Sequence, residues 1–576
     1  MRNRTIWQRR GLAVAVISVL LVLVTACTED ELTASRASVA SVSLSPAGAT
    51  MLTGDRLRLT ATLLDADRDT LLSRQIAWSV SDEGVASVDE TGLVTAVAAG
   101  AATVTATSEG IAGSMLLSVE KKPEPVGFIG YADPAARFTA CGICHAEEQT
   151  EWRGTNHSEA WAGLQTSDLA EEGCELCHTV TERGNAVEQI GGYELTSDQR
   201  FYDVQCESCH GPGQAHAVAA DPGAEPPHAS IAEGGGMTSG CGECHTFLEQ
   251  PQLEEWEQSV MAQIPNYAIA AATDDACLDC HEGKTALMKR FGVTADYAEK
   301  AEDSPLPIVC VVCHDPHSSE FEADLRVSPS DTADHLCLRC HAHRATPPSQ
   351  AGPHAAQGSL LLGNGGYTPP GYEDQVDAGR HVTAHGPVRN LRLCVTCHLP
   401  KFSGASLYRY TGHTFDAIPC QDSRGEVTPG PCPDEERYFQ ACARSGCHGG
   451  PGFAMAVDYW GRWARHNQLL DQLWLDSDGD RVIDATDGGL LAQLVALGDT
   501  LQFVFTDDSV TLGEGALWNA QLAFTADRTH FADGEVLGMR FSANKSSGNG
   551  VHNPFLLEAL LLTSIKALEE FLEARR

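Results

Sequence analysis

The sequence predicts a multidomain fold: a small all-β sandwich, then a mostly helical and irregular region, then a C-terminal segment that ends in a helix. Three observations lead to this expectation. Residues 41–120 alternate apolar and polar side chains, residues 138–456 are rich in cysteine and histidine but lack regular periodicity, and residues 555–571 are strongly apolar. Because a domain averages roughly 150 residues, a chain of 576 residues has room for three or four modules.

Composition excludes two classes of protein. The chain has 39 basic and 78 acidic residues, a formal net charge of −39, so we expect no nucleic-acid partner, which would need a basic surface. Its content of 43% hydrophobic and 20% charged residues is that of a folded chain and argues against wholesale disorder.

Residues 1–27 have the features of an export signal. Four arginines in the first ten residues precede an apolar run, Leu12–Val24, that is short for a membrane span. Small residues then precede Cys27, and the segment resembles a bacterial lipoprotein signal. The resemblance implies a lipidated Cys27 that holds the chain at a membrane and, because Thr28 is not acidic, an outer-membrane lipoprotein on the periplasmic face or the cell surface. An ordinary signal peptide or an uncleaved anchor is the alternative.

Residues 41–120 should form the β-sandwich. Their short apolar-polar segments are separated by Gly, Asp and Ser turns, as in the set Leu57, Leu59, Ala61 and Leu63. The region resembles the group 2 bacterial Ig-like domain, and the residues that carry the resemblance are Trp78–Ser81, Val85–Asp89, Gly92–Ala96, Gly100 and Ala102–Ala106. We expect a spacer that holds the next domain away from the membrane, with adhesion or ligand binding as the alternative role.

Residues 121–137 are a linker that begins with the stiff, proline-containing stretch Lys121–Pro125. The domain predicted at residues 138–456 contains many Gly and Pro residues. Its core must therefore come from something other than packed aliphatic side chains.

Residues 138–456 contain eight CXXCH motifs. In such a motif the two cysteines can form thioethers to both vinyl groups of one haem, and the adjacent histidine is then placed on the iron. Zinc sites also use CXXC pairs, but eight motifs in an exported chain favour haem c. The motifs are Cys141/Cys144/His145, Cys174/Cys177/His178, Cys206/Cys209/His210, Cys241/Cys244/His245, Cys277/Cys280/His281, Cys310/Cys313/His314, Cys337/Cys340/His341 and Cys394/Cys397/His398.

A ninth site is less regular. Four residues separate Cys442 from Cys447, and His448 follows directly. The longer loop can still bring both sulfurs to a haem, which gives about nine haems in all; a disulfide between these cysteines is the alternative. Cys420 and Cys432 have no adjacent histidine and lie in a loop rich in Pro, Gly and Asp, which predicts a disulfide between them.

The histidine count tests this scheme. Nine of the 22 histidines are proximal, and the 13 that remain exceed the nine distal ligands that nine haems need. The supply permits bis-histidine iron throughout, which leaves no open site for a substrate and suits electron transfer. At least four of the 13 then have other roles. Our distal candidates are His157, His216, His317, His335, His343, His385 and His552.

Two of these candidates follow a motif closely. His317 lies three residues after His314, and His343 lies two residues after His341. Neither can easily reach the far face of the haem that its neighbour ligates. Both are therefore expected to serve adjacent haems.

Part of the haem region resembles a known family. The residues that carry the likeness to the cytochrome c-554 group are Trp152–His157, Cys174–His178, Val204–Gly213 and His216. That tetrahaem family is linked to hydroxylamine oxidation, and its wider superfamily includes octahaem reductases. The resemblance covers residues 138–245 and implies closely stacked haems joined by short helices and loops, but it does not carry over hydroxylamine chemistry. The absence of a CXXCK motif counts against an ammonia-forming nitrite reductase.

The motif spacing also indicates an internal repeat. The first three motifs are separated by 29 and 28 residues, and the next three by 32 and 29, so a third, looser unit would complete nine haems. Met261 lies five residues after Trp256, as His157 lies five residues after Trp152, and so takes the position of a presumed distal histidine. Thioether sulfur is the other common haem ligand and favours ferrous iron. A core methionine beside a haem that is ligated from elsewhere is the alternative.

The C-terminal segment, residues 457–576, contains an acidic loop. Carboxylates occupy loop positions 1, 3, 5, 9 and 12, which are calcium-coordinating positions, in the order Asp476, Asp478, Asp480, Asp484 and Asp487. The loop resembles a dockerin-type Ca²⁺ site, but it has Asp at position 12 and no Gly at position 6; a solvated acidic turn is the alternative. The apolar helix at Phe555–Phe571 should pack on the haem domain, with His552 as a candidate ligand just before it.

These observations predict an electron-transfer multihaem c-type cytochrome anchored at the bacterial cell envelope. Its acidic field would favour the oxidised, more positive state of each haem. Its partners would be redox proteins or an extracellular acceptor. The alternative is a multihaem reductase or oxidoreductase that acts on a small nitrogen or sulfur species at one five-coordinate haem. No catalytic residue is singled out.

Overall fold

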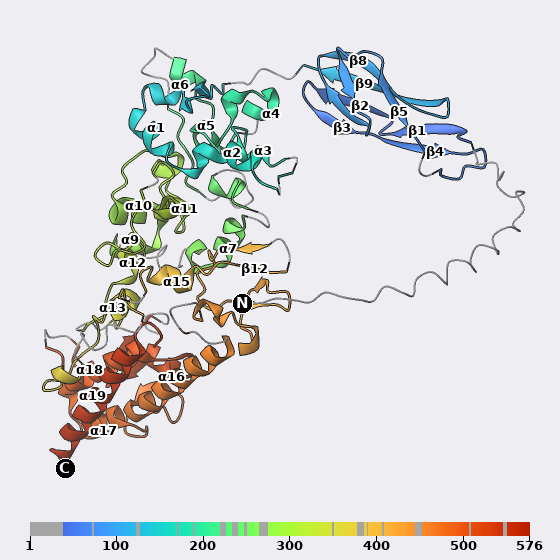
Figure 1. The fold of residues 1–576 in the computed structure, drawn as a ribbon. Coiled ribbons are helices and arrows are strands. Elements are labelled where there is room, and N and C mark those ends of the chain that lie inside the picture. Colours follow the sequence, from blue (N-terminus) through green and yellow to red (C-terminus); the bar gives the residue numbers. More distant parts are fainter. Residues whose placement is uncertain are drawn as a thin grey trace, which may run out of the picture. The chain divides into compact units, whose positions relative to one another are not determined.

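The structure, a computed structural model, describes residues 38–576 except for a set of short segments. Those segments are 72–73, 122–126, 169, 172, 188–189, 219–225, 233–239, 247–249, 264–274, 319, 348–350, 377–384, 389, 406–407, 444–447, 449–451, 506–508 and 545–549. The predicted export signal with Cys27, the stretch at 122–126 and Cys447 therefore lie outside the described residues. The contacts divide the chain into two compact units, Met1–Glu124 and Pro125–Arg576, drawn in Figure 1.

The first unit contains the predicted β-sandwich. Its sheets have the strand orders β2-β9-β8-β5, β3-β7-β6 and β1-β4, and β2 pairs with β9 in parallel. The strands are β1 (Ser41–Ser45), β2 (Gly48–Leu52), β3 (Arg56–Arg58), β4 (Thr60–Leu64), β5 (Ala77–Val80), β6 (Ala86–Val88), β7 (Leu93–Ala96), β8 (Gly100–Ser108) and β9 (Ile111–Glu120).

Alternating burial explains the sandwich. On β8, Ala102, Val104 and Ala106 are buried, whereas the residues between them are only partly covered. Leu117 on β9 joins them in one hydrophobic core. A period of two places these side chains on the same face of the sheet, so the all-β prediction for this region is confirmed.

Short helices and loops make up the first part of the second unit, as predicted. Its helices are α1 (Ala146–Trp152), α2 (Ala160–Gln165), α3 (Glu175–His178), α4 (Gly192–Thr196), α5 (Glu207–His210), α6 (Gln214–Val218), α7 (Gln252–Gln258), α9 (Asp275–His281), α10 (Gly283–Phe291), α11 (Cys310–Cys313), α12 (Leu338–His341), α13 (Gln357–Leu361) and α15 (Cys394–His398). Its antiparallel strand pairs are β10 (Tyr131–Asp133) with β11 (Phe138–Thr139), β12 (Phe402–Ser403) with β13 (Arg409–Tyr410), and β14 (Cys420–Gln421) with β15 (Val427–Thr428).

A disulfide cross-links residues 420 and 432 of this region. Cys420 at the start of β14 is bonded to Cys432, which confirms the pairing predicted from the sequence. The hairpin of β14 and β15 lies between the two cysteines, so the bond closes a loop that has little apolar surface of its own.

Longer elements build the C-terminal part of this unit. They are α16 (Gly452–Leu473), β16 (Val482–Ile483), α17 (Leu490–Ala496), α18 (Leu512–Ala523), β17 (Asp533–Val536), β18 (Met539–Ser542) and α19 (Pro554–Glu573). The predicted apolar helix is α19. It begins where Asn553 Oδ1 accepts a hydrogen bond from the Leu556 backbone N–H at 3.1 Å, with a proline in its first turn. In the part of the chain that the structure describes, no helix is both long and apolar enough to cross a membrane.

The C-terminal core reaches into the haem region. Ala345, Ala356 and Leu360 belong to the same buried cluster as the interior of α18 and α19. Two buried hydrogen bonds fix the contact: Trp518 Nε1 donates to the Ala345 carbonyl at 3.1 Å, and Asn553 Nδ2 donates to the Leu360 carbonyl at 3.0 Å. The residues around α13 are therefore held on a rigid helical base.

We expect the substitution Leu557→Ala to lower the free energy of unfolding of the helical part by about 2–5 kcal/mol, because it leaves a cavity in a closed core. Leu557 is 0% exposed in α19. The matched control is Leu562→Ala on the same helix, where the side chain is 41% exposed and the expected change is below about 0.5 kcal/mol. Urea unfolding followed by far-ultraviolet circular dichroism measures both, and equal effects would contradict the placement of this core.

Candidate haem sites

The CXXCH motifs fold into short helical turns. In the first, third and fourth motifs the histidine N–H donates to the carbonyl of the first cysteine at 2.9–3.0 Å. Residues four apart share one face of such a turn, so the first cysteine and the histidine of a motif lie side by side. The local sequence thus presents thiols and an imidazole together.

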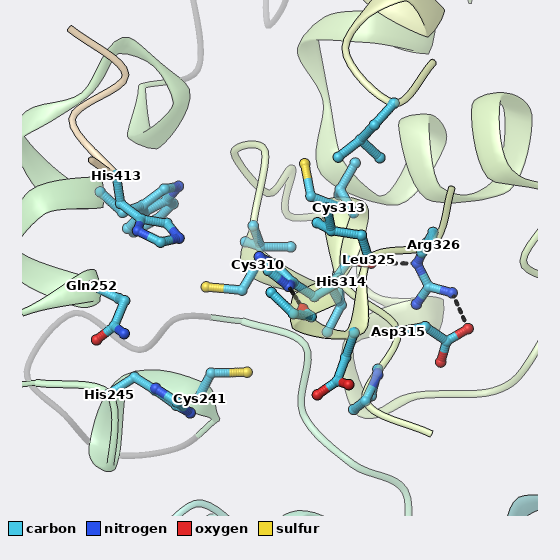
Figure 2. Close-up of a pocket in the computed structure, with 18 of the residues that line it drawn as sticks. Cys241, His245, Gln252, Cys310, Cys313, His314, Asp315, Leu325, Arg326 and His413 are labelled. Carbon is cyan, nitrogen blue, oxygen red and sulfur yellow. Dashed lines mark hydrogen bonds and ion pairs between the residues drawn. The ribbon is translucent and has the colours of Figure 1, made fainter. Parts of the chain in front are cut away.

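All nine motifs contribute to the lining of one continuous cavity of about 3420 Å³. Figure 2 shows part of it, where Cys241 and His245 of the fourth motif lie across from Cys310 and His314 of the sixth, with His413 above. The sites are therefore joined rather than separate, which is the arrangement that closely spaced cofactors need.

Six of the nine proximal histidines have a second imidazole opposite them. Metal–imidazole bonds are about 2 Å long, and a ring centre lies about 1 Å behind its nitrogen, so two axial imidazoles on one metal have centres about 6 Å apart. The observed distances between ring centres are 6.1 Å for His245 and His157, 6.1 Å for His210 and His317, 5.9 Å for His281 and His354, 6.4 Å for His314 and His413, 6.1 Å for His448 and His385, and 6.2 Å for His398 and His552.

Hydrogen bonds orient several of these rings for ligation. The Nδ1 atom bonds to a backbone carbonyl and leaves Nε2 for a metal. The pairs are His178 with Ala160 at 2.9 Å, His210 with Pro227 at 2.8 Å, His314 with Ala323 at 2.7 Å, His398 with Phe415 at 2.7 Å, and His385 with Val551 at 2.7 Å.

Burial favours the neutral form of three of the facing imidazoles. Desolvation lowers the pKa of His245, His354 and His413 to about 4, with smaller contributions from neighbouring cationic groups. An imidazole must be unprotonated to bind a metal. Thiol pairs for thioethers, together with facing neutral imidazoles, are a donor set that fits haem c.

The distal candidates from the sequence fall into two groups. His157, His317, His385 and His552 each face a proximal ring at the distance given above, and His343 instead faces His354, at 6.1 Å. The remaining two, His216 and His335, face no proximal ring among the described residues.

His335 has a different environment from the facing histidines. It is 1% exposed, its Nδ1 accepts a hydrogen bond from the Cys337 N–H at 3.1 Å, and it lies beside Cys337 and Cys394. It therefore lies next to the first cysteines of the seventh and eighth motifs.

Two facing histidines, His354 and His413, were not among our distal candidates. His413 is held by a loop: its N–H donates to Glu255 Oε2 at 2.8 Å, and Phe415 in the same loop accepts the hydrogen bond from His398. Each lies far along the chain from its partner, and no local spacing marks either one. Only the long-range topology could have identified them.

Cysteines of different motifs also come together. The thiol pairs within hydrogen-bonding reach are Cys141 with Cys206, Cys177 with Cys244, Cys280 with Cys340, and Cys337 with Cys394. The first motif is therefore beside the third, the second beside the fourth, the fifth beside the seventh, and the seventh beside the eighth.

Further contacts close the gaps between these pairs. Cys209 is close enough to Cys241 to affect its thiol, and Cys313 is likewise close to Cys337, which joins the third motif to the fourth and the sixth to the seventh. His314 similarly acts on His245, which joins the fourth to the sixth. The Val551 carbonyl bonds to His385, which faces His448 of the ninth site, and the next residue, His552, faces His398 of the eighth motif. The eighth and ninth sites are therefore neighbours. Motifs 1, 3, 4, 6, 7, 8 and 9 thus form one series in which each motif neighbours the next, and we call this series the main line. Motifs 2 and 5 lie beside it.

Equivalent contacts support the internal repeat. Trp152 Nε1 donates to the Val204 carbonyl, and Trp256 Nε1 donates to the Ile308 carbonyl, both at 2.9 Å and both across 52 residues. Motif 2 touches motif 4, the first motif of the next unit, and motif 5 likewise touches motif 7. The eighth motif lies beside the seventh as the third lies beside the first, so it corresponds to the third member of a unit.

The acidic loop in the C-terminal part brings three of the five predicted carboxylates together. Oxygens of Asp476, Asp478 and Asp487 lie within 4.8 Å of one another. Asp480 Oδ1 accepts from the Val482 N–H at 2.8 Å, and Asp484 Oδ1 accepts from the backbone two residues later at 2.6 Å, so these two hold the loop in shape.

Comparisons with protein families match three parts of the chain. The Bacterial Ig-like domain (group 2) matches residues 38–115, Cytochrome c554 and c-prime matches residues 140–211, and the Doubled CXXCH motif matches residues 304–346. The last two matches fall on the cavity-lining motifs.

Individual relatives cover limited parts of the chain. Multiheme cytochrome MtrA of Shewanella baltica is 25% identical over 193 residues, which are 31% of this chain and 54% of that protein. An alpha-L-arabinofuranosidase of Bifidobacterium longum is 42% identical over 73 residues, 12% of this chain and 7% of that one. The chain thus spans about half the length of the first relative and a small part of the second.

Among solved structures, domains 4 and 5 of the S-layer protein SbsC match with 18% identity and a TM-score of 0.14. The match covers 14% of this chain and 53% of that chain.

The family matches, together with the CXXCH motifs and the facing histidines, support haem c binding and electron transfer in general. The chain is therefore a multihaem c-type cytochrome that carries an N-terminal Ig-like domain of bacterial group 2.

Proposed function

We propose that this cytochrome relays single electrons through nine haems at the bacterial cell envelope. When bound, haem c supplies an iron that takes up and releases one electron. The observation that carries the proposal is the set of six facing histidine pairs. Five of the pairs line one cavity, and the motifs that neighbour one another in it touch. An iron held by two such imidazoles would have no position free for a substrate, which suits transfer rather than catalysis.

In this proposal the chain's residues have three tasks. The paired cysteines of each motif fix a haem covalently, and the adjacent histidine is its proximal ligand. The distal ligands are His157, His317, His354, His385, His413 and His552, each from a different part of the chain. Carbonyl acceptors such as Phe415 O hold the rings at the orientation that ligation requires.

The two ends of the main line are suited to exchange with partners. At the first motif, Cys144 and His145 are exposed and Ile143 is 69% exposed. At the ninth site, His448 is exposed. We infer that a reduced redox protein is oxidised at one end, and that a second redox protein or an extracellular acceptor is reduced by the same electron at the other.

The envelope address rests on the N-terminal part of the chain. The group 2 Ig-like match and the likeness to a multihaem cytochrome suggest an extracellular or envelope protein. We propose that lipidated Cys27 anchors the chain in the outer membrane and that the Ig-like domain is the spacer above it.

The acidic loop is proposed to bind Ca²⁺. Support comes from the carboxylates of Asp476, Asp478 and Asp487, whose oxygens are close enough to share one cation. Trp474 Nε1 donates to Asp487 Oδ2 at 2.8 Å, and Trp474 is buried in the helical core. A cation here would stiffen the start of the C-terminal core rather than take part in electron transfer.

A second function, reduction of a small nitrogen or sulfur species, is favoured by one observation. Within the described residues, His145, His178 and His341 face no second imidazole. A five-coordinate iron at one of them would offer an open position. The spin-state measurement described below distinguishes this reductase function from electron relay.

We expect nine covalent haems per chain. Intact mass and a haemochrome assay measure the count, and the double substitution Cys442→Ser with Cys447→Ser should lower it to eight, because it removes the thioethers of the irregular site. As the control, Cys420→Ser breaks only the disulfide and should leave nine. A parent count of eight would refute the ninth assignment.

We expect most of the iron in the oxidised protein to be low-spin, because facing imidazoles saturate it. Electron paramagnetic resonance of the full chain, with and without small anions, should give unchanged low-spin signals. Abundant high-spin signal together with turnover of nitrite, hydroxylamine or tetrathionate would instead support the reductase.

We expect Cys27→Ser to release the cytochrome from the membrane fraction, because it removes the proposed lipid attachment. Fractionation of cells and intact mass measure the change, and Cys420→Ser should stay membrane-bound. If Cys27→Ser remains in the membrane with the parent mass, another anchor holds the protein.

A further inference from the structure

Met261 occupies the structural position of a facing histidine. In the first repeat unit the Val204 N–H donates to the His157 carbonyl at 3.1 Å, and in the second the Ile308 N–H donates to the Met261 carbonyl at 3.1 Å. These are the same partners that accept the two tryptophan indoles described above. The backbone of both units therefore positions residue 157 and residue 261 alike.

The turn that precedes each residue is also the same. Thr155 Oγ1 donates to the Trp152 carbonyl at 2.8 Å, and Ser259 Oγ donates to the Trp256 carbonyl at 2.7 Å. A hydroxyl three residues after the tryptophan thus closes both turns. The two units thus share the same backbone conformation at this position and differ in the side chain, which is histidine in the first unit and methionine in the second.

The haem that this side chain would meet follows from the repeat. His157 faces His245 of the fourth motif, the first member of the second unit. The corresponding first member of the third unit is the seventh motif, with His341. Met261 should therefore lie toward the haem of His341.

The surroundings of His245 and His341 match in the motifs that lie next to them. His245 is influenced by His178 and His314, which belong to the second and sixth motifs. His341 is influenced by His281 and His398, which belong to the fifth and eighth. The thiol contacts match as well, since the second motif touches the fourth as the fifth touches the seventh. His245 also has His157 beside it, and the residue at the equivalent repeat position is Met261. His341 differs further in a hydrogen bond with the Gln357 side chain.

Other assignments fit less well. The fifth haem does not need Met261, because His281 already faces His354 at 5.9 Å. His335 lies beside cysteines of the seventh and eighth motifs, and its Nδ1 accepts a hydrogen bond from the Cys337 N–H. A neutral ring in this state carries its proton on Nε2, so neither nitrogen is free to bind a metal. Met261 is partly buried against apolar residues and lines the cavity that the motifs share.

We propose that Met261 is the distal ligand of the seventh haem, opposite His341. The proposal rests on the proposed function, since it assumes that the seventh motif carries haem. A methionine in place of one histidine raises the reduction potential of the iron. The seventh motif touches the fifth, sixth and eighth, so the most easily reduced site would stand where the side branch meets the main line.

The test compares the full-length holoprotein with Met261→Leu, which removes the sulfur but keeps an apolar side chain, and Met261→His, which restores the residue of the first unit. Met288→Leu, on α10 and 48% exposed, is the matched control. The readouts are the near-infrared charge-transfer band of methionine-ligated ferric haem and a potentiometric titration. We expect the parent and Met288→Leu to show the band, and both Met261 variants to lose it. In Met261→His the highest-potential component should move into the range of the others.

A band that is absent from the parent, or that survives in Met261→Leu, overturns the assignment. Haem mass separates this failure from a failure of the proposed function: nine haems without the band reject only the methionine ligand, whereas an unmodified seventh motif rejects the relay itself. If Met261→Leu does not mature, Met261→His still decides the question, because retention of the band in it would exclude Met261 as the ligand.

Discussion

Facing imidazoles are the contacts on which the haem region depends. They join segments that are remote in sequence: His398 faces His552 about 150 residues later, and His314 faces His413 about 100 residues later. Among the described residues, the hydrophobic clusters of this region, such as those around Trp256 and around Phe128, contain far fewer buried side chains than the C-terminal core. Because closing such long loops costs conformational entropy, strong metal–ligand bonds are a suitable replacement for a continuous aliphatic core.

The sequence predicts what is local and leaves open what is long-range. The sandwich follows from period-two alternation, α19 from its apolar run, and the Cys420–Cys432 bond from a lack of adjacent histidines. Which distal histidine faces which proximal histidine cannot be predicted from such local patterns. His354 and His413 are single histidines in loops, and what brings each to its partner is the path of the whole chain, here a hydrogen bond to the buried Glu255 far upstream for His413.

The repeat explains why the units do not stand alone. The histidine that faces the third motif, His317, follows the sixth motif, and the one that faces the sixth, His413, follows the eighth. Each unit thus completes a site in the unit before it. The last such partner, His552, comes from the helical C-terminal part, which caps the series and ties it to a conventional core.

The disulfide has a consequence for how the protein is made. Oxidation must join Cys420 to Cys432, yet the cysteines of the motifs must stay reduced until each has reacted with a vinyl group. In the folded chain Cys141 and Cys206, which belong to different motifs, are already within hydrogen-bonding reach. An oxidant that acts before haem attachment would therefore cross-link motifs wrongly. Biogenesis needs a reductant directed at the motif thiols and an order of events in which cofactor attachment comes before final compaction.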